Sequence, residues 1–199
     1  MAGCAGRPGI RGYALIADSF LTAVAAFAAW LGAATIVLAD GRRGLGVGIA
    51  LVAVGFTAIA WSDGVWVGGG FLLVGCAIAV IALLRAGPQD WGLMPAGSTS
   101  RVILAVAVGI VSLWMAASVT TGPGASLRFA SLAVLALMAG RLLQTNAAVP
   151  ALTGAAGLAI ALAGASQLGP NDSGFAPYVI AAMVTAGALL LPAARSHGA

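Results

Sequence analysis

The sequence predicts an all-α fold: a polytopic transmembrane helix bundle of about seven spans, built as one helix followed by three hairpins. Composition is the first observation behind this prediction, because 61% of the 199 residues are hydrophobic types and only 7% are charged. Soluble domains carry about a quarter charged residues, so this chain cannot cover itself with a water-facing surface. A disordered chain needs the opposite composition. The second observation is a series of long apolar runs separated by turn residues.

Each predicted element follows from the length of an apolar run. Crossing the hydrocarbon layer takes about 17–25 residues, and lipid offers no partner for backbone N–H and C=O groups, so the spans must be helices. None of the runs alternates as β-barrel strands do. We expect one integral membrane domain over 1–199, with a first span at 13–39 and hairpins at 44–84, 102–143 and 149–191.

The N-terminal run is interpreted as a retained span. Arg7 and Arg11 precede it, as in the basic region of a signal peptide, but the run is about twice as long as a signal-peptide core and lacks a convincing cleavage site. Turn residues separate the later runs, at 40–43, 62–64, 122–124 and 169–174, and the longest connector, 85–101, contains two prolines.

The arginines predict the orientation. With seven spans, six arginines fall on one face, namely Arg42, Arg43, Arg85, Arg101, Arg141 and Arg195. The other face receives Arg7, Arg11 and Arg128. The positive-inside bias then puts the C-terminus in the cytoplasm and the N-terminus outside. Abundant Ala, Gly and Arg without Lys indicate a bacterial source, so we expect a multi-pass protein of the bacterial plasma (inner) membrane.

The three hairpins show a weak internal repeat. Their second helices end at Arg85, Arg141 and Arg195, and the segments Ala53–Phe56 and Ala107–Ile110 align. Either duplication or the placement of arginines in any hairpin array explains this spacing. The stretches 48–75 and 101–141, with glycines punctuating apolar helices around an outer turn, resemble HdeD-like membrane proteins. The resemblance implies a non-enzymatic inner-membrane protein linked to acid stress, and no catalytic residues are carried over.

Several chemistries lack the residues they need. Without lysine no Schiff base can form, and the single histidine, His197, is three residues from the end. Cys4 and Cys76 have no metal-ligand spacing, and the five aspartates are dispersed. We therefore expect no enzyme activity, no catalytic or metal site and no cofactor. The scattered arginines form no basic stripe, so nucleic acid is not expected as a partner.

Charged residues near the spans are the first candidate contacts. Asp18 is interpreted as an interfacial acid at a helix N-terminus, with a pathway acid as the alternative. Arg128 and Arg141 are expected to extend to the lipid headgroups. Arg42 and Arg43 orient the chain in a turn or, alternatively, bind a lipid headgroup or an acidic partner.

The polar segment after Arg141, which includes Gln144 and Asn146 and closes at Pro150, is the most unusual. We favour a cytoplasmic loop with Pro150 starting the next helix. The alternative is a broken helix that lines a substrate site.

Two functions stay open. The first is a non-catalytic accessory, stress-related or complex-forming component of the membrane. The alternative is a small-solute or ion permeation protein with a pathway lined by Thr57, Ser112, Ser131 and Thr153. Membrane lipid, other membrane-protein subunits and further copies of the chain are the expected partners.

Overall fold

The computed structural model describes residues 8–85, 99–119, 124–145, 147–169 and 174–195, with side chains described over 18–85, 99–115, 124–145, 147–169 and 174–190. In these ranges the chain forms seven α-helices and no strand, so the all-helical fold class is confirmed. The helices are α1 (Pro8–Leu38), α2 (Arg42–Ser62), α3 (Trp66–Arg85), α4 (Thr99–Val119), α5 (Ala125–Gln144), α6 (Ala148–Ser166) and α7 (Ala176–Arg195).

Five of these helices are long and apolar enough to cross a membrane: α1 from Asp18, α2, α3, α5 and α6. The apolar stretches of α4 and α7, at Thr99–Met115 and Ala176–Leu190, are shorter. Large apolar side chains such as Phe71, Ile103 and Trp114 lie more than half exposed on the outer surface, which suits contact with lipid rather than water. The chain is therefore a multi-pass membrane protein.

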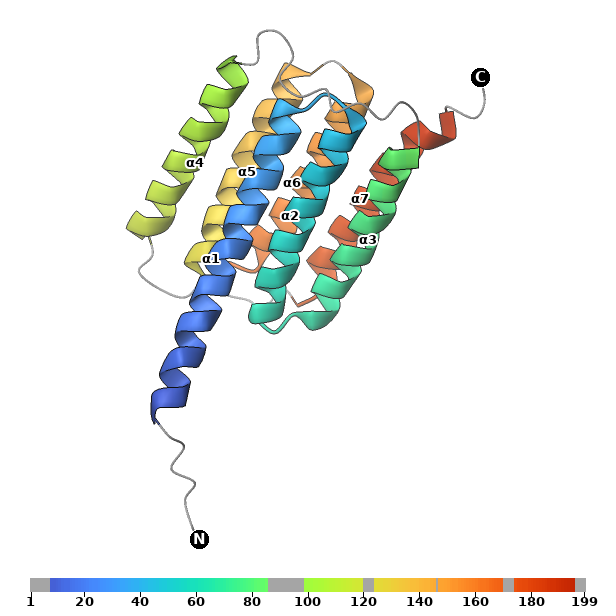
Figure 1. Cartoon of the computed structure of the whole chain (residues 1–199). Helices are drawn as coiled ribbons and strands as arrows, with labels where there is room; N and C mark the ends of the chain where they lie inside the picture. Colours follow the sequence, from blue (N-terminus) through green and yellow to red (C-terminus); the bar gives the residue numbers. More distant parts are fainter. Residues whose placement is uncertain (1–7, 86–98, 120–123, 146, 170–173, 196–199) are drawn as a thin grey trace.

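Six helices close into a ring (Figure 1). Neighbours in the ring follow the order α1, α2, α3, α7, α6, α5 and back to α1, and α2 also contacts α6 across the middle. Helix α4 lies outside the ring, against α5 and, more lightly, α1. Although α3 and α4 are consecutive in the sequence, they lie on opposite sides of the bundle (Figure 1).

Small residues allow the helix backbones to approach closely. A Cβ atom added to Gly32 of α1 would lie 2.6 Å from the Gly48 carbonyl oxygen of α2, and one added to Gly55 would lie 2.5 Å from the Ala25 carbonyl oxygen. The contact between α3 and α7 uses Gly75 against Ala182 in the same way. In lipid, such close packing replaces the hydrophobic driving force between helices.

Helix α1 is longer than the bilayer requires. Its 31 residues span about 46 Å at 1.5 Å per residue, against a hydrocarbon thickness of about 30 Å. The N-terminal part extends beyond the rest of the bundle (Figure 1). The helix begins at Pro8, five residues before the predicted start at Tyr13, because nothing in the intervening sequence breaks it.

The two ends of the bundle differ in charge. Arg42, Arg85, Arg101 and Arg141 belong to helix ends that meet at one end, whereas Arg128 lies in the first turn of α5 at the other end. At that second end each hairpin turn contains a glycine with positive φ, at Gly64 (82°), Gly124 (91°) and Gly174 (61°), a conformation that other residues adopt only with strain.

The hairpins are not packed equivalently. Hairpin α2–α3 packs against hairpin α6–α7, whereas α4–α5 is split, with α5 in the ring and α4 outside it. Gly55 and Gly109, which align in the sequence repeat, do share one feature. Both face α1: Gly55 lies against Ala25 and Ala29, and Gly109 lies against Trp30.

Candidate functional site

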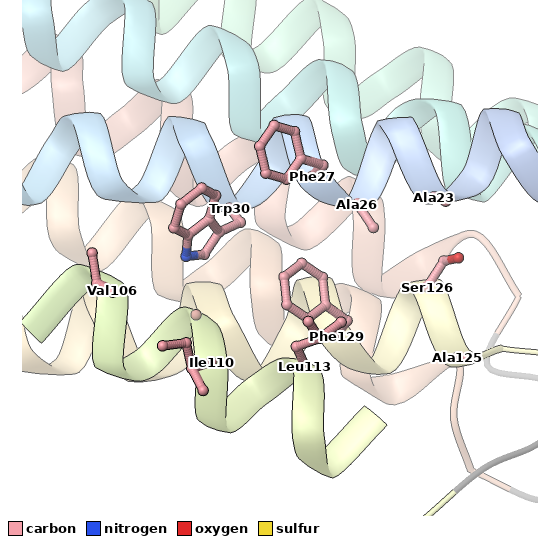
Figure 2. A pocket seen from close by; sticks show the side chains of 11 residues that line it. Ala23, Ala26, Phe27, Trp30, Val106, Ile110, Leu113, Ala125, Ser126 and Phe129 are labelled. Atoms are coloured by element: carbon pink, nitrogen blue, oxygen red, sulfur yellow. The ribbon is translucent and has the colours of Figure 1, made fainter. Parts of the chain in front are cut away.

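The outlying position of α4 leaves an apolar groove between α1, α4 and α5, with a volume of about 540 Å³ (Figure 2). Its wall on α1 contains Ala23, Ala26, Phe27 and Trp30. Helix α4 contributes Val106, Gly109, Ile110 and Leu113, and α5 contributes Ala125, Ser126 and Phe129. Phe27, Ile110 and Leu113 are each more than half exposed, so the groove opens sideways onto the lipid-facing surface.

Trp30 is a partly buried aromatic residue of the groove wall. Its indole extends from α1 toward α4 (Figure 2) and lies against Gly109, where an added Cβ would be 2.7 Å from the indole nitrogen. The Phe27 and Trp30 ring centroids are 5.3 Å apart. The buried indole N–H has no hydrogen-bond partner among the described residues. A groove of this composition, apolar apart from the Ser126 hydroxyl, can hold a hydrocarbon chain.

A buried arginine joins α5 to the end of α1 at the opposite end of the bundle. Arg141, in the last turn of α5, is 1% exposed. Its guanidinium donates to the carbonyl oxygens of Ala39 at 3.0 Å and Val37 at 3.4 Å, and to the Asp40 carboxylate. The carbonyls at a helix C-terminus have no partner within the helix, so Arg141 caps α1 from a distant part of the chain.

Asp40 is shared between two cations. Arg101, in the first turn of α4, donates to both Asp40 oxygens at 3.1 and 3.2 Å. Thus one carboxylate connects the end of α1 to α4 and to α5. Burial raises the pKa of Asp40, but the hydrogen bonds and charges of Arg141 and Arg101 outweigh burial and hold this pKa below 3.8.

The low pKa of Asp40 predicts the pH range over which this connection stabilises the fold. A lowered pKa adds stability that is fully present above the unfolded value, 3.8, and is lost as the pH falls through the folded pKa. We expect the difference in unfolding free energy between wild type and Asp40→Asn to stay constant from pH 7 to about 5 and to shrink below that. Detergent unfolding followed by circular dichroism measures it, and a difference that already shrinks near pH 6 would contradict the assignment.

Two sequence-based interpretations need correction. Arg141 does not extend to the headgroups, because the carbonyls at the end of α1 and Asp40 hold it inside the bundle. Arg128 is half-buried, and its extension to the headgroups stays a prediction. Asp18 is exposed but lies ten residues beyond the start of α1, so no helix N-terminus stabilises it. Its charge instead contributes to the raised pKa of Asp63.

The remaining candidates lie near the Asp40 end. Arg42 and Arg43 open α2 and are half-buried. Helix α5 continues through Gln144, which is exposed, and α6 begins at Ala148 with Pro150 in its first turn, so a short connector and not a broken helix joins them. Asn146 lies outside the described residues. Sequence reasoning missed Asp40 as the partner of Arg141, because a separation of 101 residues carries no local signal.

The four hydroxyl residues named for a permeation pathway are all buried, namely Thr57, Ser112, Ser131 and Thr153. Thr57 donates to the Gly69 carbonyl and Thr153 to the Val149 carbonyl of its own helix. Phe56 fills the middle of the ring, and a Cβ on Gly164 of α6 would lie 2.3 Å from its ring. The Ser131 hydroxyl is buried beside the same glycine.

Comparison of the chain with models of protein families, with curated proteins and with solved structures finds no match.

Proposed function

We propose that this protein is a non-catalytic accessory component of the bacterial inner membrane that works through its lipid-facing surface. The observation that carries the proposal is the groove between α1, α4 and α5, in which we place a single hydrocarbon chain of a membrane lipid. Two of the three groove helices, α1 and α5, are long and apolar enough to span, and α4 contributes a shorter apolar stretch. The exposed wall residues of the groove face the surface that we expect lipid to cover.

The size of the groove favours a lipid chain over a partner helix. One turn of a helix about 10 Å across and 5.4 Å high occupies on the order of 400 Å³. A groove of about 540 Å³ therefore accommodates little more than one turn, whereas a flexible hydrocarbon chain can follow its length. The filled centre of the ring, with Phe56 against Gly164, gives permeation no comparable support.

The proposed orientation and the proposed role in acid stress rest on the distribution of arginines and on the resemblance to HdeD-like proteins. The arginine-rich end of the bundle supports a cytoplasmic C-terminus by the positive-inside rule. The resemblance to HdeD-like proteins supports a role in acid stress. A connection at Asp40 that remains charged in mild acid is consistent with that role, because the tie between α1, α4 and α5 then persists.

The groove can be tested with a lipid brominated on its chains, which quenches tryptophan fluorescence on contact. In a variant that retains only Trp30, we expect quenching in detergent micelles to saturate at about one lipid per protein. Ala23 is exposed and lines the groove, so Ala23→Phe should fill it without disturbing the core and should abolish saturable quenching.

Two controls make this test specific. Ala77→Phe adds the same side chain at an exposed position of α3 and should leave the quenching of Trp30 unchanged. A variant that retains only Trp114, which is 69% exposed on α4, should show quenching without saturation. Equal quenching in the Ala23→Phe and Ala77→Phe variants would refute the groove as a lipid site.

A further inference from the structure

A second, polar cavity lies at the end of the bundle opposite Asp40. Its volume is about 410 Å³, and all three hairpin turns contribute to its wall. The α2–α3 turn contributes Asp63, Gly64 and Val65. The start of α5 contributes Gly124, Leu127 and Arg128, and the α6–α7 turn contributes Gln167, Leu168 and Gly174. The three glycines with positive φ all line it, so much of the wall is bare backbone.

Arg128 is the cationic group of this cavity. Its side chain is half-buried, and its Nη1 atom is shielded from solvent yet has no hydrogen-bond partner among the described residues. Buried donors in native proteins are nearly always paired, and a guanidinium is costly to leave unpaired. Helix α5 also begins here, directly after its N-cap residue Gly124, and it has no side-chain cap. The backbone N–H groups of its first turn therefore add positive potential.

Asp63 is the anionic group. It lines the same cavity, but within the described part of the chain it forms no ion pair with Arg128. Burial, followed by the charge of Asp18, raises the pKa of this carboxyl above 3.8. Gln167 closes the rim by donating from its amide to the Gly174 carbonyl at 2.9 Å, which leaves its side-chain oxygen free to accept.

In the described part of the chain, Arg128 and Asp63 therefore line one cavity without forming an ion pair with each other. A ligand that carries both charges a few bonds apart satisfies them together, whereas a simple anion meets the repulsion of Asp63. We propose that this cavity binds a phosphoethanolamine group, with the phosphate at Arg128 and the N-terminus of α5 and the ammonium at Asp63 and Gln167. The group can come from a lipid headgroup or from a free solute, and this site is separate from the lipid groove.

Binding can be measured with two phosphodiester probes, one whose arm ends in an ammonium group and one whose arm ends in hydroxyl groups. Purified protein in lipid-free micelles is titrated with glycerophosphoethanolamine and, in parallel, with glycerophosphoglycerol. We expect the first to bind at least about tenfold more tightly, since one charge-assisted hydrogen bond contributes on the order of this factor. Repeating the titration with phosphatidylethanolamine and phosphatidylglycerol in mixed micelles identifies the source. Saturation by the lipid alone assigns a headgroup, and saturation by the soluble compound assigns a free solute.

Three variants separate the two charges. Asp63→Asn should bind both soluble probes with the same affinity, because only the ammonium contact is lost. Arg128→Gln should weaken the affinity for both probes by about tenfold or more. Arg128→Lys retains a cation and should keep part of the phosphate affinity, which distinguishes lost binding from lost folding. Arg85→Gln, an exposed arginine at the other end of the bundle, is the matched control and should behave as wild type. The proposal is overturned if neither ethanolamine probe saturates, if Asp63→Asn keeps the preference for the ammonium arm, or if Arg85→Gln weakens binding as much as Arg128→Gln.

Discussion

Replacing Asp40 with asparagine should destabilise the fold more than replacing its buried partner Arg141 with methionine. Arg141 is 1% exposed, whereas the Asp40 side chain is 40% exposed. Asp40→Asn leaves a guanidinium inside the bundle with only neutral acceptors, and an uncompensated buried charge costs about 3–5 kcal/mol. We expect a loss near the lower end of that range, because the carbonyls of Val37 and Ala39 remain as acceptors.

Arg141→Met removes the buried charge, whereas Asp40→Asn leaves that charge buried without its anionic partner. Asp40 can then turn to water and to Arg101, so the loss should be about 1–2 kcal/mol, mainly from the uncapped carbonyls of α1. The double variant should be no less stable than Asp40→Asn alone, since the methionine relieves the stranded charge. Unfolding of all three variants in mixed detergent micelles, followed by circular dichroism, measures this coupling. Strictly additive losses would show that the pair does not interact as described.

The second large effect is expected at the contact between α1 and α2. In Gly32→Ala, the new Cβ would lie 2.6 Å from the Gly48 carbonyl oxygen and 2.7 Å from the Val52 backbone nitrogen. Both neighbours are backbone atoms that no rotamer change can move, so the helices must separate. Overpacking of this kind costs typically 1–3 kcal/mol, and we expect the upper part of that range because α2 has further close contacts with α1.

Gly70→Ala is the matched control for this prediction. Gly70 lies inside α3, and a Cβ added there meets nothing within 4 Å. The substitution should be neutral or should stabilise the helix by about 0.5–1 kcal/mol, as alanine usually does in a helix interior. If thermal unfolding gave the same change in stability for both variants, the close approach of α1 and α2 would not be the cause of the loss in Gly32→Ala.

Much of the architecture could be read from the residues. The apolar runs predicted helices because lipid leaves no other spanning structure for a single chain of this composition. The turn residues marked where the helices separate, and the distribution of arginines predicted which ends lie together. The groove was not predicted, because its wall comes from residues such as Trp30, Gly109 and Phe129 that look like ordinary span residues in the sequence. The polar cavity was not predicted, because its wall comes from three turns that are far apart in the sequence.

Arg128 and Arg141 show where sequence reasoning ends. They lie near opposite ends of the same helix. Hydropathy predicts the same position for each, with the side chain extended to the lipid headgroups. In the fold, one lines an open cavity and the other caps a distant helix. The medium and the helical state depend on local composition, so the sequence alone determines them. Which helices become neighbours depends on how small residues such as Gly32 and Gly75 fit facing helices, and only the packed bundle decides that.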